Sequence, residues 1–344
     1  MLFPRSQPKL SDDQREIPSP PSDAARLFQD AIAELGWDAD PVAIAEQVRR
    51  LNIGLPAEDE FAVLCAWLGK CDLIHKLDQA QGPSSSRDRF QVPDFLASFS
   101  TATTPVLVEV KSKASKTLSF RSDYYERLSN YAGLVGLPIL VAWKFHSLWT
   151  VFELRQMRKA VSNYNIRFEE AMTQSLLCSL VGDVGYRIGS GAGMHLHFMK
   201  ENLLDIHANE EERSSTWMVR FDSITFTDYL GGNALSLSDE VQELFKTWDL
   251  SERDADSDTH VTKSFVASDR DGMQFAHTAL VRLLDWETAE GESANWRGLA
   301  RQEKILRSIS DFRSVLKKAL EERIVDTIID IRPKEMPAFL KTQS

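Results

Sequence analysis

Apolar and polar residues alternate most clearly between Val92 and Lys113, and this pattern predicts two short strands joined by a polar turn over residues 100–104. The second strand carries Val106, Val108 and Val110 on one face and Leu107, Glu109 and Lys111 on the other. We expect the valine face to be buried and the opposite face, with its ionisable groups, to meet solvent. Asp94 lies on the first predicted strand, so its carboxylate can approach this second face.

Helical periodicity and short apolar runs predict the elements around this pair of strands. On its N-terminal side we predict helices over residues 23–35, 41–51 and 58–68 and a strand over residues 71–77. The first two helices end at Gly36 and near Gly54, and Pro56 precedes the third. On its C-terminal side we predict a helix over residues 123–135 and strands over residues 138–145 and 148–154. Because the run PILVAWKF is apolar throughout, we expect that strand to be buried on both faces and joined to the valine strand by a parallel crossover.

The second half of the chain predicts a further mixture of helices and strands. The first predicted elements are a helix over residues 167–180, a glycine-rich hairpin over 185–198, a strand over 217–226, a helix over 237–248 and an acidic loop over 251–260. They are followed by helices over residues 274–286, 296–301 and 310–322 and a strand over 324–331. His195 and His197 share a strand face, which we interpret as a polar face because no third metal ligand stands near them in the sequence.

The last three predicted helices and the strand that follows them resemble a winged helix-turn-helix. In that arrangement the helix over residues 310–322 presents Arg313, Lys317 and Lys318 to DNA. A helical packing or dimerisation module with a basic, solvent-facing side explains the same pattern, and the residues alone do not decide between the two.

Composition narrows the class of protein. The chain has 344 residues, of which 43% are hydrophobic and 26% charged, as in soluble globular proteins. No window approaches the roughly 18 apolar residues that a transmembrane helix needs. The first 21 residues are rich in Pro, Ser and charge and lack the apolar segment of a secretory signal. We therefore expect a cytoplasmic protein with a disordered N-terminal tail and with reduced, buried cysteines at Cys65, Cys71 and Cys178.

Charge separates one segment from the rest of the chain. The formal net charge of −11 argues against a protein that coats nucleic acid without specificity. Residues 57–160 differ, with 13 Lys and Arg against 11 Asp and Glu, a net charge of +2. This segment contains Asp94, Glu109 and Lys111. Two carboxylates at a sheet edge can hold a divalent cation, and a lysine beside them can stabilise charge on a phosphoryl group. The pattern therefore indicates metal-assisted phosphodiester hydrolysis.

The same residues resemble the motif of the PD-(D/E)xK nuclease superfamily, here as Pro93-Asp94 followed by Glu109-Val110-Lys111. The predicted order of helix, three strands, helix and strand is similar to the core of that superfamily. Residues 125–154 are also similar to the helix-strand-strand segment that ends the fold of archaeal Holliday junction resolvases. The implied fold is an α/β, restriction-endonuclease-like mixed sheet flanked by helices over about residues 57–155, with an additional α+β region C-terminal to it.

The resemblance also implies a cofactor and roles for individual residues. It implies Mg²⁺ or Mn²⁺ held by Asp94, Glu109 and the backbone carbonyl of Val110, with Glu60 helping through a water molecule. It implies that Lys111 positions the attacking water and shields the scissile phosphate. The residues expected to hold the DNA backbone are Lys113, Lys116, Arg121 and Arg127. Arg127 and Tyr131 have the spacing of the QxxxY motif of exonuclease-type members, with arginine in place of glutamine.

These implications predict a Mg²⁺-dependent DNA endonuclease. The large remainder of the chain favours restriction or phage defence, because target recognition needs additional surface. One alternative is a Holliday junction resolvase, which requires a homodimer, or a DNA-repair nuclease. Another is a non-catalytic DNA-binding scaffold on the same fold. No GxxxxGK[ST] loop is present, so coupling to nucleotide hydrolysis would require a partner protein.

We predict five regions along the chain. They are a disordered tail (1–21), an N-terminal helical cap (22–56), the nuclease core (57–160), an α+β accessory region (161–270) and a helical C-terminal region (271–344). The winged-helix pattern falls in the last of them.

Overall fold

The computed structural model describes residues 31–32, 35–36, 40–78, 81–208, 213–234, 237–248, 250–269, 272–288 and 311–341. The chain divides into two compact units, residues 1–55 and 56–344. The predicted disordered tail, most of the first predicted helix and the short helix predicted at 296–301 lie outside the described residues. Ala31, Ile32 and Leu35 are helical, and Gly36 ends that helix as predicted, with a left-handed φ of 87°.

A single long helix, α2 (Pro41–Trp67), occupies the place where the sequence predicted two helices separated by Gly54 and Pro56. A proline inside a helix costs about 3 kcal/mol, so it breaks a helix only where packing does not compensate. Here the residues that follow it are well packed, since Phe61 and Leu64 are fully buried in the main hydrophobic core. The predicted break is therefore wrong.

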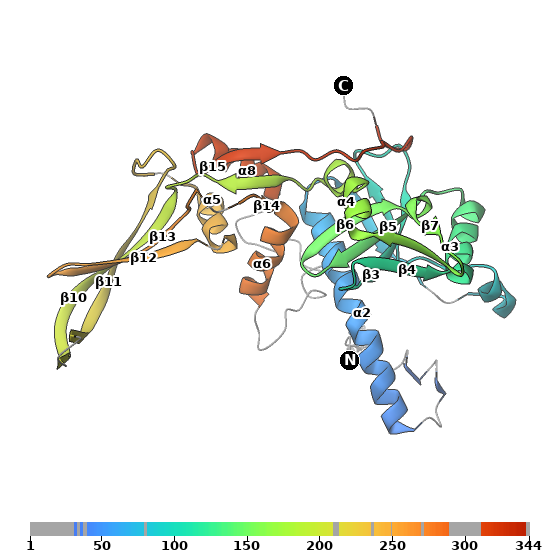
Figure 1. The fold of residues 1–344 in the computed structure, drawn as a ribbon, viewed down its shortest axis with the longest axis horizontal. Helices are drawn as coiled ribbons and strands as arrows, with labels where there is room; N and C mark the ends of the chain where they lie inside the picture. Colours follow the sequence, from blue (N-terminus) through green and yellow to red (C-terminus); the bar gives the residue numbers. More distant parts are fainter. Residues whose placement is uncertain are drawn as a thin grey trace, which may run out of the picture. The chain divides into compact units, whose positions relative to one another are not determined.

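The second unit contains a five-stranded mixed sheet of order β1-β2-β3-β5-β6 (Figure 1). Its strands are β1 (Cys71–Lys76), β2 (Phe95–Phe99), β3 (Val106–Ser112), β5 (Ile139–Phe145) and β6 (Leu148–Glu153). β3 and β5 are parallel, and the other neighbouring strands are antiparallel. The helix α3 (Ser122–Val135) lies between β3 and β5 in the sequence. The predicted α/β mixed sheet, with its parallel crossover, is confirmed.

Strand β3 is buried on both faces, whereas the sequence predicted one solvent-facing side. Val106, Val108 and Val110 belong to the main hydrophobic core, as expected. The opposite face is covered as well, because Tyr124 of α3 donates a hydrogen bond to the carboxylate of Glu109. The helix therefore removes from water the carboxylate that alternation alone placed in solvent.

A second sheet has the order β4-β8-β7 and consists of β4 (Thr117–Arg121), β8 (Asn163–Arg167) and β7 (Arg158–Lys159). None of its strands was predicted. Leu118, Phe120 and Ile166 pack in a second hydrophobic core together with residues of α3 and β5. The helix predicted over residues 167–180 is instead α4 (Phe168–Thr173) followed by a π-turn, Leu177–Val181. The chain leaves the helix between them because the Leu176 amide donates to Val151 of the edge strand β6, at 2.6 Å.

A third sheet, of order β14-β9-β15, occupies the C-terminal part of the chain. It consists of β14 (Gln274–Phe275), β9 (Gly185–Ile188) and β15 (Val325–Ile329), with α6 (Ala276–Thr288) and α8 (Phe312–Glu321) between β14 and β15 in the sequence. β15 pairs with β9, from much earlier in the chain, and not with a neighbouring strand of a wing. The predicted winged helix is therefore not confirmed.

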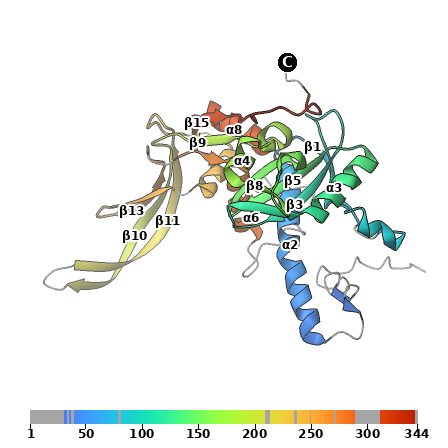
Figure 2. The ribbon, with the colours of Figure 1, turned by 45° about the vertical axis from the view of Figure 1, so that its right-hand side comes forward.

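A fourth sheet has the order β11-β10-β13-β12 (Figure 2). It consists of β10 (Gly193–Ala208), β11 (Arg213–Thr227), β12 (Ser251–Asp256) and β13 (His260–Val266). Two predictions are wrong here. The predicted glycine-rich hairpin consists of β9 and β10, which belong to different sheets. The predicted acidic loop forms the hairpin of β12 and β13. Cross-strand pairing stabilises that acidic strand, since Lys263 forms an ion pair with Glu252 at 3.0 Å. The helix predicted over 237–248 is the short α5 (Asp239–Glu243) and a 3-10 turn, Leu244–Thr247.

No helix in the described part of the chain is long and apolar enough to cross a membrane.

Candidate active site

Asp94 and Glu109, which the sequence placed on neighbouring strands, are both buried in the folded protein. Asp94 immediately precedes β2, Glu109 lies on β3, and the two residues are 4% and 1% exposed. The antiparallel register pairs Phe95 with Val108, which brings the two carboxylates to the same end of the strand pair. The amide of Val110 donates to Asp94 Oδ2 at 2.7 Å and fixes the side chain of Asp94.

Burial and neighbouring charges together set the electrostatics of this site. Burial raises the pKa of the Asp94 carboxyl well above its usual range, and the charge of Glu109 raises it further, while Lys111 acts in the opposite direction. Burial acts to lower the pKa of Lys111, but the surrounding Glu109, Tyr124 and Asp94 outweigh this effect and raise it. Lys111 is therefore a charged ammonium at neutral pH.

The two oxygens of Glu109 have different environments. Lys111 Nζ and the hydroxyl of Tyr124 both donate to Oε1. Oε2 is buried and has no hydrogen-bond partner. A buried carboxylate oxygen without a partner is costly, and a hard divalent cation is the kind of ligand that removes this cost. Oε2 of Glu109 beside the carboxylate of Asp94 thus fits Mg²⁺ or Mn²⁺.

Tyr124 is a residue of this site that the sequence analysis missed. Its pKa is raised by burial and by the adjacent Glu109, so its hydroxyl keeps its proton and acts as a donor. The ring packs edge-on against Phe120 at 5.3 Å, and Lys111 Nζ lies 5.4 Å from the ring centroid. Tyr124 therefore positions both Glu109 and Lys111. Only the contact between α3 and β3 identifies it, because tyrosine at the start of an amphipathic helix carries no motif.

The structure gives Glu60 partners of its own. Glu60 Oε1 accepts a hydrogen bond from Trp149 Nε1 at 2.8 Å, and Oε2 forms an ion pair with Lys144. Among the described residues no group of three or more His, Cys, Asp or Glu side chains is arranged to hold a metal. The predicted contribution of Glu60 to a metal site stays a prediction that these contacts do not favour.

Glu58, on the same helix, is the acid that interacts with Asp94. Its charge raises the pKa of Asp94, and its Oε2 lies 2.5 Å from Lys76 Nζ. Glu58 and Glu60 are two residues apart, so their side chains point about 200° apart around the helix axis. The sequence alone therefore could not decide which of the two glutamates points toward the motif.

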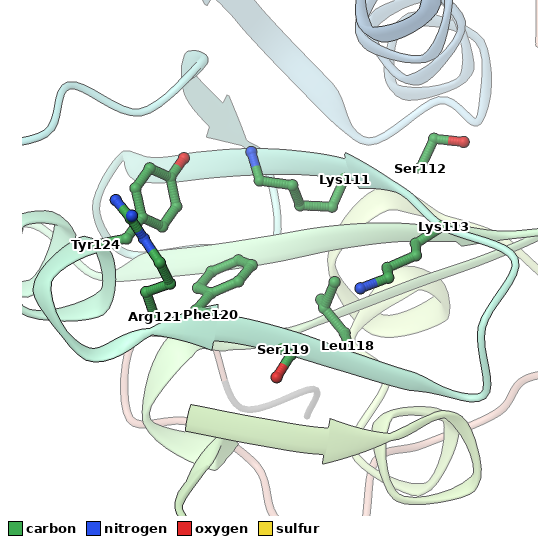
Figure 3. A pocket seen from close by; sticks show the side chains of 8 residues that line it. All are labelled: Lys111, Ser112, Lys113, Leu118, Ser119, Phe120, Arg121 and Tyr124. Atoms are coloured by element: carbon green, nitrogen blue, oxygen red, sulfur yellow. The ribbon is translucent and has the colours of Figure 1, made fainter. Parts of the chain in front are cut away.

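A pocket of about 290 Å³ lies beside Lys111 (Figure 3). Its lining comes from β3, β4 and the start of α3: Lys111, Ser112, Lys113, Leu118, Ser119, Phe120, Arg121 and Tyr124. Lys111 and Tyr124 lie next to each other, and Arg121 lines the same pocket. Of the predicted DNA-binding residues, Lys113, Lys116 and Arg121 are exposed in this region.

Arg127 holds a turn of the protein. Its Nη1 donates to the carbonyl of Arg87 at 3.0 Å, and Nη2 lies 3.7 Å from Asp123. Asn130, also on α3, donates to the carbonyl of Arg89 at 3.1 Å. These bonds fix the turn that contains the 3-10 helix Ser84–Asp88, and they leave the side chains of Arg87 and Arg89 exposed. A DNA contact by Arg127 itself stays a prediction.

The C-terminal candidates are mostly engaged within the protein. Arg313 donates to both oxygens of Asp330, at 2.8 and 3.0 Å, and Lys318 pairs with Glu240 at 3.2 Å. Lys317 is exposed. Their predicted role in DNA binding therefore rests on Lys317 more than on the other two.

His195 and His197 share one face of the fourth sheet, as predicted. The ring nitrogens of His195 lie 2.9 Å from the hydroxyl of Ser264 and 3.0 Å from that of Thr227. Those of His197 are hydrogen-bonded in the same way to Thr262 and Thr225. Both imidazoles therefore belong to a ladder of hydroxyl groups, which matches the interpretation as a polar strand face.

Taken together, the sheet order and the buried motif define an α/β fold of the restriction-endonuclease type. Residues 79–180 match the family model described as archaeal Holliday junction resolvase (hjc). One solved structure that is similar to the chain is that of Archaeoglobus fulgidus Hjc, a Holliday junction resolvase from an archaeal hyperthermophile. It is 21% identical and covers 34% of this chain and 89% of its own, with a TM-score of 0.28. No curated protein matches the chain.

The family match confirms the resemblance drawn from the motif. Residues 79–180 are similar to the archaeal Holliday junction resolvase family, and that family belongs to the restriction-endonuclease-like superfamily. The match includes Asp94, Glu109, Lys111 and Tyr124 but not the two glutamates of α2.

We expect Tyr124→Phe to lower cleavage activity and raise the concentration of Mg²⁺ needed for half-maximal activity. The variant keeps the ring against Phe120 but loses the hydrogen bond to Glu109 Oε1, and such supporting contacts are worth roughly 10- to 100-fold in metal affinity or activity. Tyr125→Phe is the matched control, because Tyr125 stacks on Tyr164 at 3.6 Å instead. Equal metal dependence in both variants would show that Tyr124 only fills space.

Proposed function

We propose that this protein is a metal-dependent DNA endonuclease that hydrolyses phosphodiester bonds at Asp94, Glu109 and Lys111. The observation that carries this proposal is the partnerless, buried Oε2 of Glu109 beside the buried carboxylate of Asp94. A protein gains no stability from such a pair, so its presence is best explained by a bound cation and the chemistry that the cation supports. The match of residues 79–180 to a nuclease family supports the same conclusion.

The residues of the site have distinct tasks in this reaction. Asp94, Glu109 Oε2 and the carbonyl of Val110 would hold Mg²⁺ or Mn²⁺, which stabilises negative charge on the phosphoryl group when bound. Lys111 supplies a fixed positive charge next to the scissile phosphate and donates a hydrogen bond to the attacking water. Tyr124 holds Glu109 in the orientation that leaves Oε2 facing inward. Glu58 adds a third negative charge near Asp94.

We propose branched DNA, and the four-way junction in particular, as the substrate to test first. The support is the family match, whose description names a Holliday junction resolvase. Restriction or phage defence, which the sequence favoured, stays a prediction, as do DNA repair, a homodimer and a partner protein. The intact constellation of Asp94, Glu109 and Lys111 speaks against a scaffold that has lost catalysis.

The decisive experiment compares a labelled four-way junction with a linear duplex of the same sequence, each with Mg²⁺, Mn²⁺ or EDTA. We expect cleavage of the junction with either metal and none in EDTA. Cleavage of both substrates at equal rates would support the proposed nuclease activity and contradict the proposed preference for junctions. Absence of cleavage of either DNA with both metals would contradict the proposed function.

Lys111→Ala should remove turnover and keep metal binding, because Lys111 is not a ligand. Isothermal titration with Mn²⁺ measures this directly on the full-length protein. The control is Lys334→Ala, an exposed lysine outside the pocket lining. A loss of Mn²⁺ affinity in Lys111→Ala would contradict the assigned role, because it would mean that the substitution disturbs the carboxylates that hold the metal.

We further propose that the nuclease domain extends to about residue 181 and not to 160. Strand β8 (Asn163–Arg167) pairs along its whole length with β4, so a boundary at 160 would divide this sheet. The family match also ends at residue 180. The other predicted region boundaries stay predictions.

A further inference from the structure

The β4-β8-β7 sheet has one buried face and one polar face. Leu118, Phe120 and Ile166 point into the second hydrophobic core. The alternate positions are exposed or half-buried and polar: Thr117, Ser119, Arg121, Arg158, Asn163, Asn165 and Arg167. Because side chains alternate along a strand, these seven residues share the outer face. They come from two stretches of sequence about 40 residues apart. No residue of β7 or β8 was among the DNA-binding residues predicted from the sequence.

The strand register spreads the three arginines over this face. Arg121 pairs with Asn163, Arg167 with Thr117, and Arg158 with Asn165, which itself pairs with Ser119. Each arginine thus lies in a different cross-strand row, and neighbouring rows on one face are about 7 Å apart. Hydroxyl and amide side chains fill the remaining positions. A regular face of guanidinium, hydroxyl and amide groups suits the repeating phosphates of a nucleic acid backbone.

The charge of this face is opposite to that of the chain. Six cations lie on or beside it: Lys113, Lys116, Arg121, Arg158, Lys159 and Arg167. Three carboxylates pair with the arginines: Asp123 with Arg121 at 3.1 Å, Glu170 with Arg158 at 2.8 Å and Glu169 with Arg167 at 3.4 Å. All three pairs are exposed, and exposed pairs contribute only about 0–1 kcal/mol, so a phosphate can replace the carboxylate at little cost. The net positive face stands out in a protein of net charge −11.

The pocket beside Lys111 joins this face to the candidate active site. Lys111 and Tyr124 line the pocket together with Ser119 and Arg121 of β4 (Figure 3). Ser119 and Arg121 also belong to the polar face, so the pocket and the face share two residues. Leu118 and Phe120, on the inner face of β4, line the same pocket, so a backbone passes from the polar face to Lys111 around the edge strand β4 at Arg121 and not through the sheet.

We propose that the outer face of the β4-β8-β7 sheet and this pocket form one track for the sugar–phosphate backbone of a DNA arm, with Arg158 and Arg167 as its outer contacts. The inference rests on the proposed nuclease function and adds the place where the substrate lies. The contacts are with phosphates and carry no sequence preference, so the track orients an arm of DNA relative to Lys111.

The test measures DNA binding by fluorescence anisotropy in a Lys111→Ala background with Mg²⁺, so that no cleavage occurs. The double variant Arg158→Glu/Arg167→Glu should bind a labelled duplex arm at least about tenfold more weakly. Its slope of log affinity against log salt should fall by about two, because each lost phosphate contact removes roughly one unit. Arg187→Glu is the matched control, an exposed arginine on β9 in a similar ion pair with Asp326 at 2.9 Å.

A variant that is expected to strengthen DNA binding makes the test specific. Glu169→Gln/Glu170→Gln removes carboxylates that compete with phosphate for Arg167 and Arg158. It should tighten binding and steepen the salt dependence, whereas a variant that merely damaged the fold would weaken binding. Melting temperatures of all variants, measured in parallel, should stay close to that of the Lys111→Ala parent.

The outcomes separate this inference from the proposed function. If the wild type cleaves junction DNA and Arg158→Glu/Arg167→Glu binds with unchanged affinity and salt slope, the track is overturned and the nuclease stands. If the wild type neither cleaves nor binds DNA, both fail together. Weaker binding in Arg158→Glu/Arg167→Glu, tighter binding in Glu169→Gln/Glu170→Gln and no change in Arg187→Glu is the result that supports the track.

Discussion

Replacing Asp94 with asparagine should abolish DNA cleavage and raise the melting temperature of the metal-free protein at neutral pH. Asparagine keeps an oxygen that can accept the hydrogen bond from the Val110 amide, but it carries no charge. The variant loses a metal ligand, and losing one group that stabilises transition-state charge typically costs roughly 10²- to 10³-fold in rate. It also loses a buried charge that burial and Glu109 both disfavour.

The pH dependence of stability follows from the raised pKa of Asp94. A carboxyl whose pKa is raised by folding favours the folded state while it is protonated. That contribution is fully present below the pKa of about 3.9 that Asp has in an unfolded chain, and it is lost as pH rises through the folded value. The metal-free wild type should therefore lose stability over this range relative to Asp94→Asn. Each kcal/mol corresponds to about 2–4 °C in melting temperature for chains of roughly 150–250 residues, and to a smaller shift for a longer chain.

Differential scanning fluorimetry with and without Mg²⁺ measures both effects. Added Mg²⁺ should raise the melting temperature of the wild type and leave Asp94→Asn unchanged. Asp72→Asn, an exposed residue of β1, is the control and should resemble the wild type in every measurement. Cleavage at the wild-type rate by Asp94→Asn, or a lower metal-free melting temperature at neutral pH, would contradict the assignment of the site.

His277→Ala should destabilise the protein by about 3–5 kcal/mol. His277 and Asp183 are each 1% exposed, and His277 Nδ1 lies 2.8 Å from Asp183 Oδ2. His277 Nε2 accepts from the amide of Trp149 at 3.2 Å, so the proton resides on Nδ1 and is donated to Asp183. Removing one partner of a buried, hydrogen-bonded pair leaves the other without compensation, which is the origin of the large cost.

These bonds connect separate parts of the second unit. His277 lies on α6, Trp149 on the edge strand β6, and Asp183 in the loop before β9. His75→Ala, at an exposed position of β1, is the control and should change stability by less than about 0.5 kcal/mol. In a double-mutant cycle, Asp183→Asn should cost much less in the His277→Ala background than in the wild type. A cost below about 1 kcal/mol for His277→Ala in chemical denaturation would contradict this account.

The elements around the catalytic motif could be predicted because their pattern is local. Alternation over residues 106–111, the apolar run from 138 to 145 and the helical period over 123–135 each concern residues within about two turns or one strand of each other. They correspond to β3, β5 and α3 within a few residues. The PD-(D/E)xK spacing lies on the hairpin of β2 and β3, so the placement of Asp94 opposite Glu109 followed from the turn between them.

Predictions failed where contacts between distant segments decided the structure. The acidic run at residues 251–256 carries no strand pattern, and it becomes a strand because β13 supplies hydrogen bonds and Lys263 supplies charge. The sequence predicted one glycine-rich hairpin where β9 and β10 lie, but β9 pairs with β15, which is about 140 residues later in the chain. Backbone hydrogen bonds between strands do not depend on sequence separation, so periodicity cannot reveal these partners.

For this protein, the sequence by itself determined the motif and its two strands and indicated the class of chemistry that we propose, because these depend on residue type and short spacing. The tertiary structure decided which atoms take part. It covered Glu109 with α3 and placed Tyr124 beside it. It paired the two oxygens of Glu60 with Trp149 and Lys144. It also placed Arg158 and Arg167 in one sheet with β4. Those outcomes depend on how helices rotate and strands pair, which is set by the packing of the whole domain and not by any one stretch of chain.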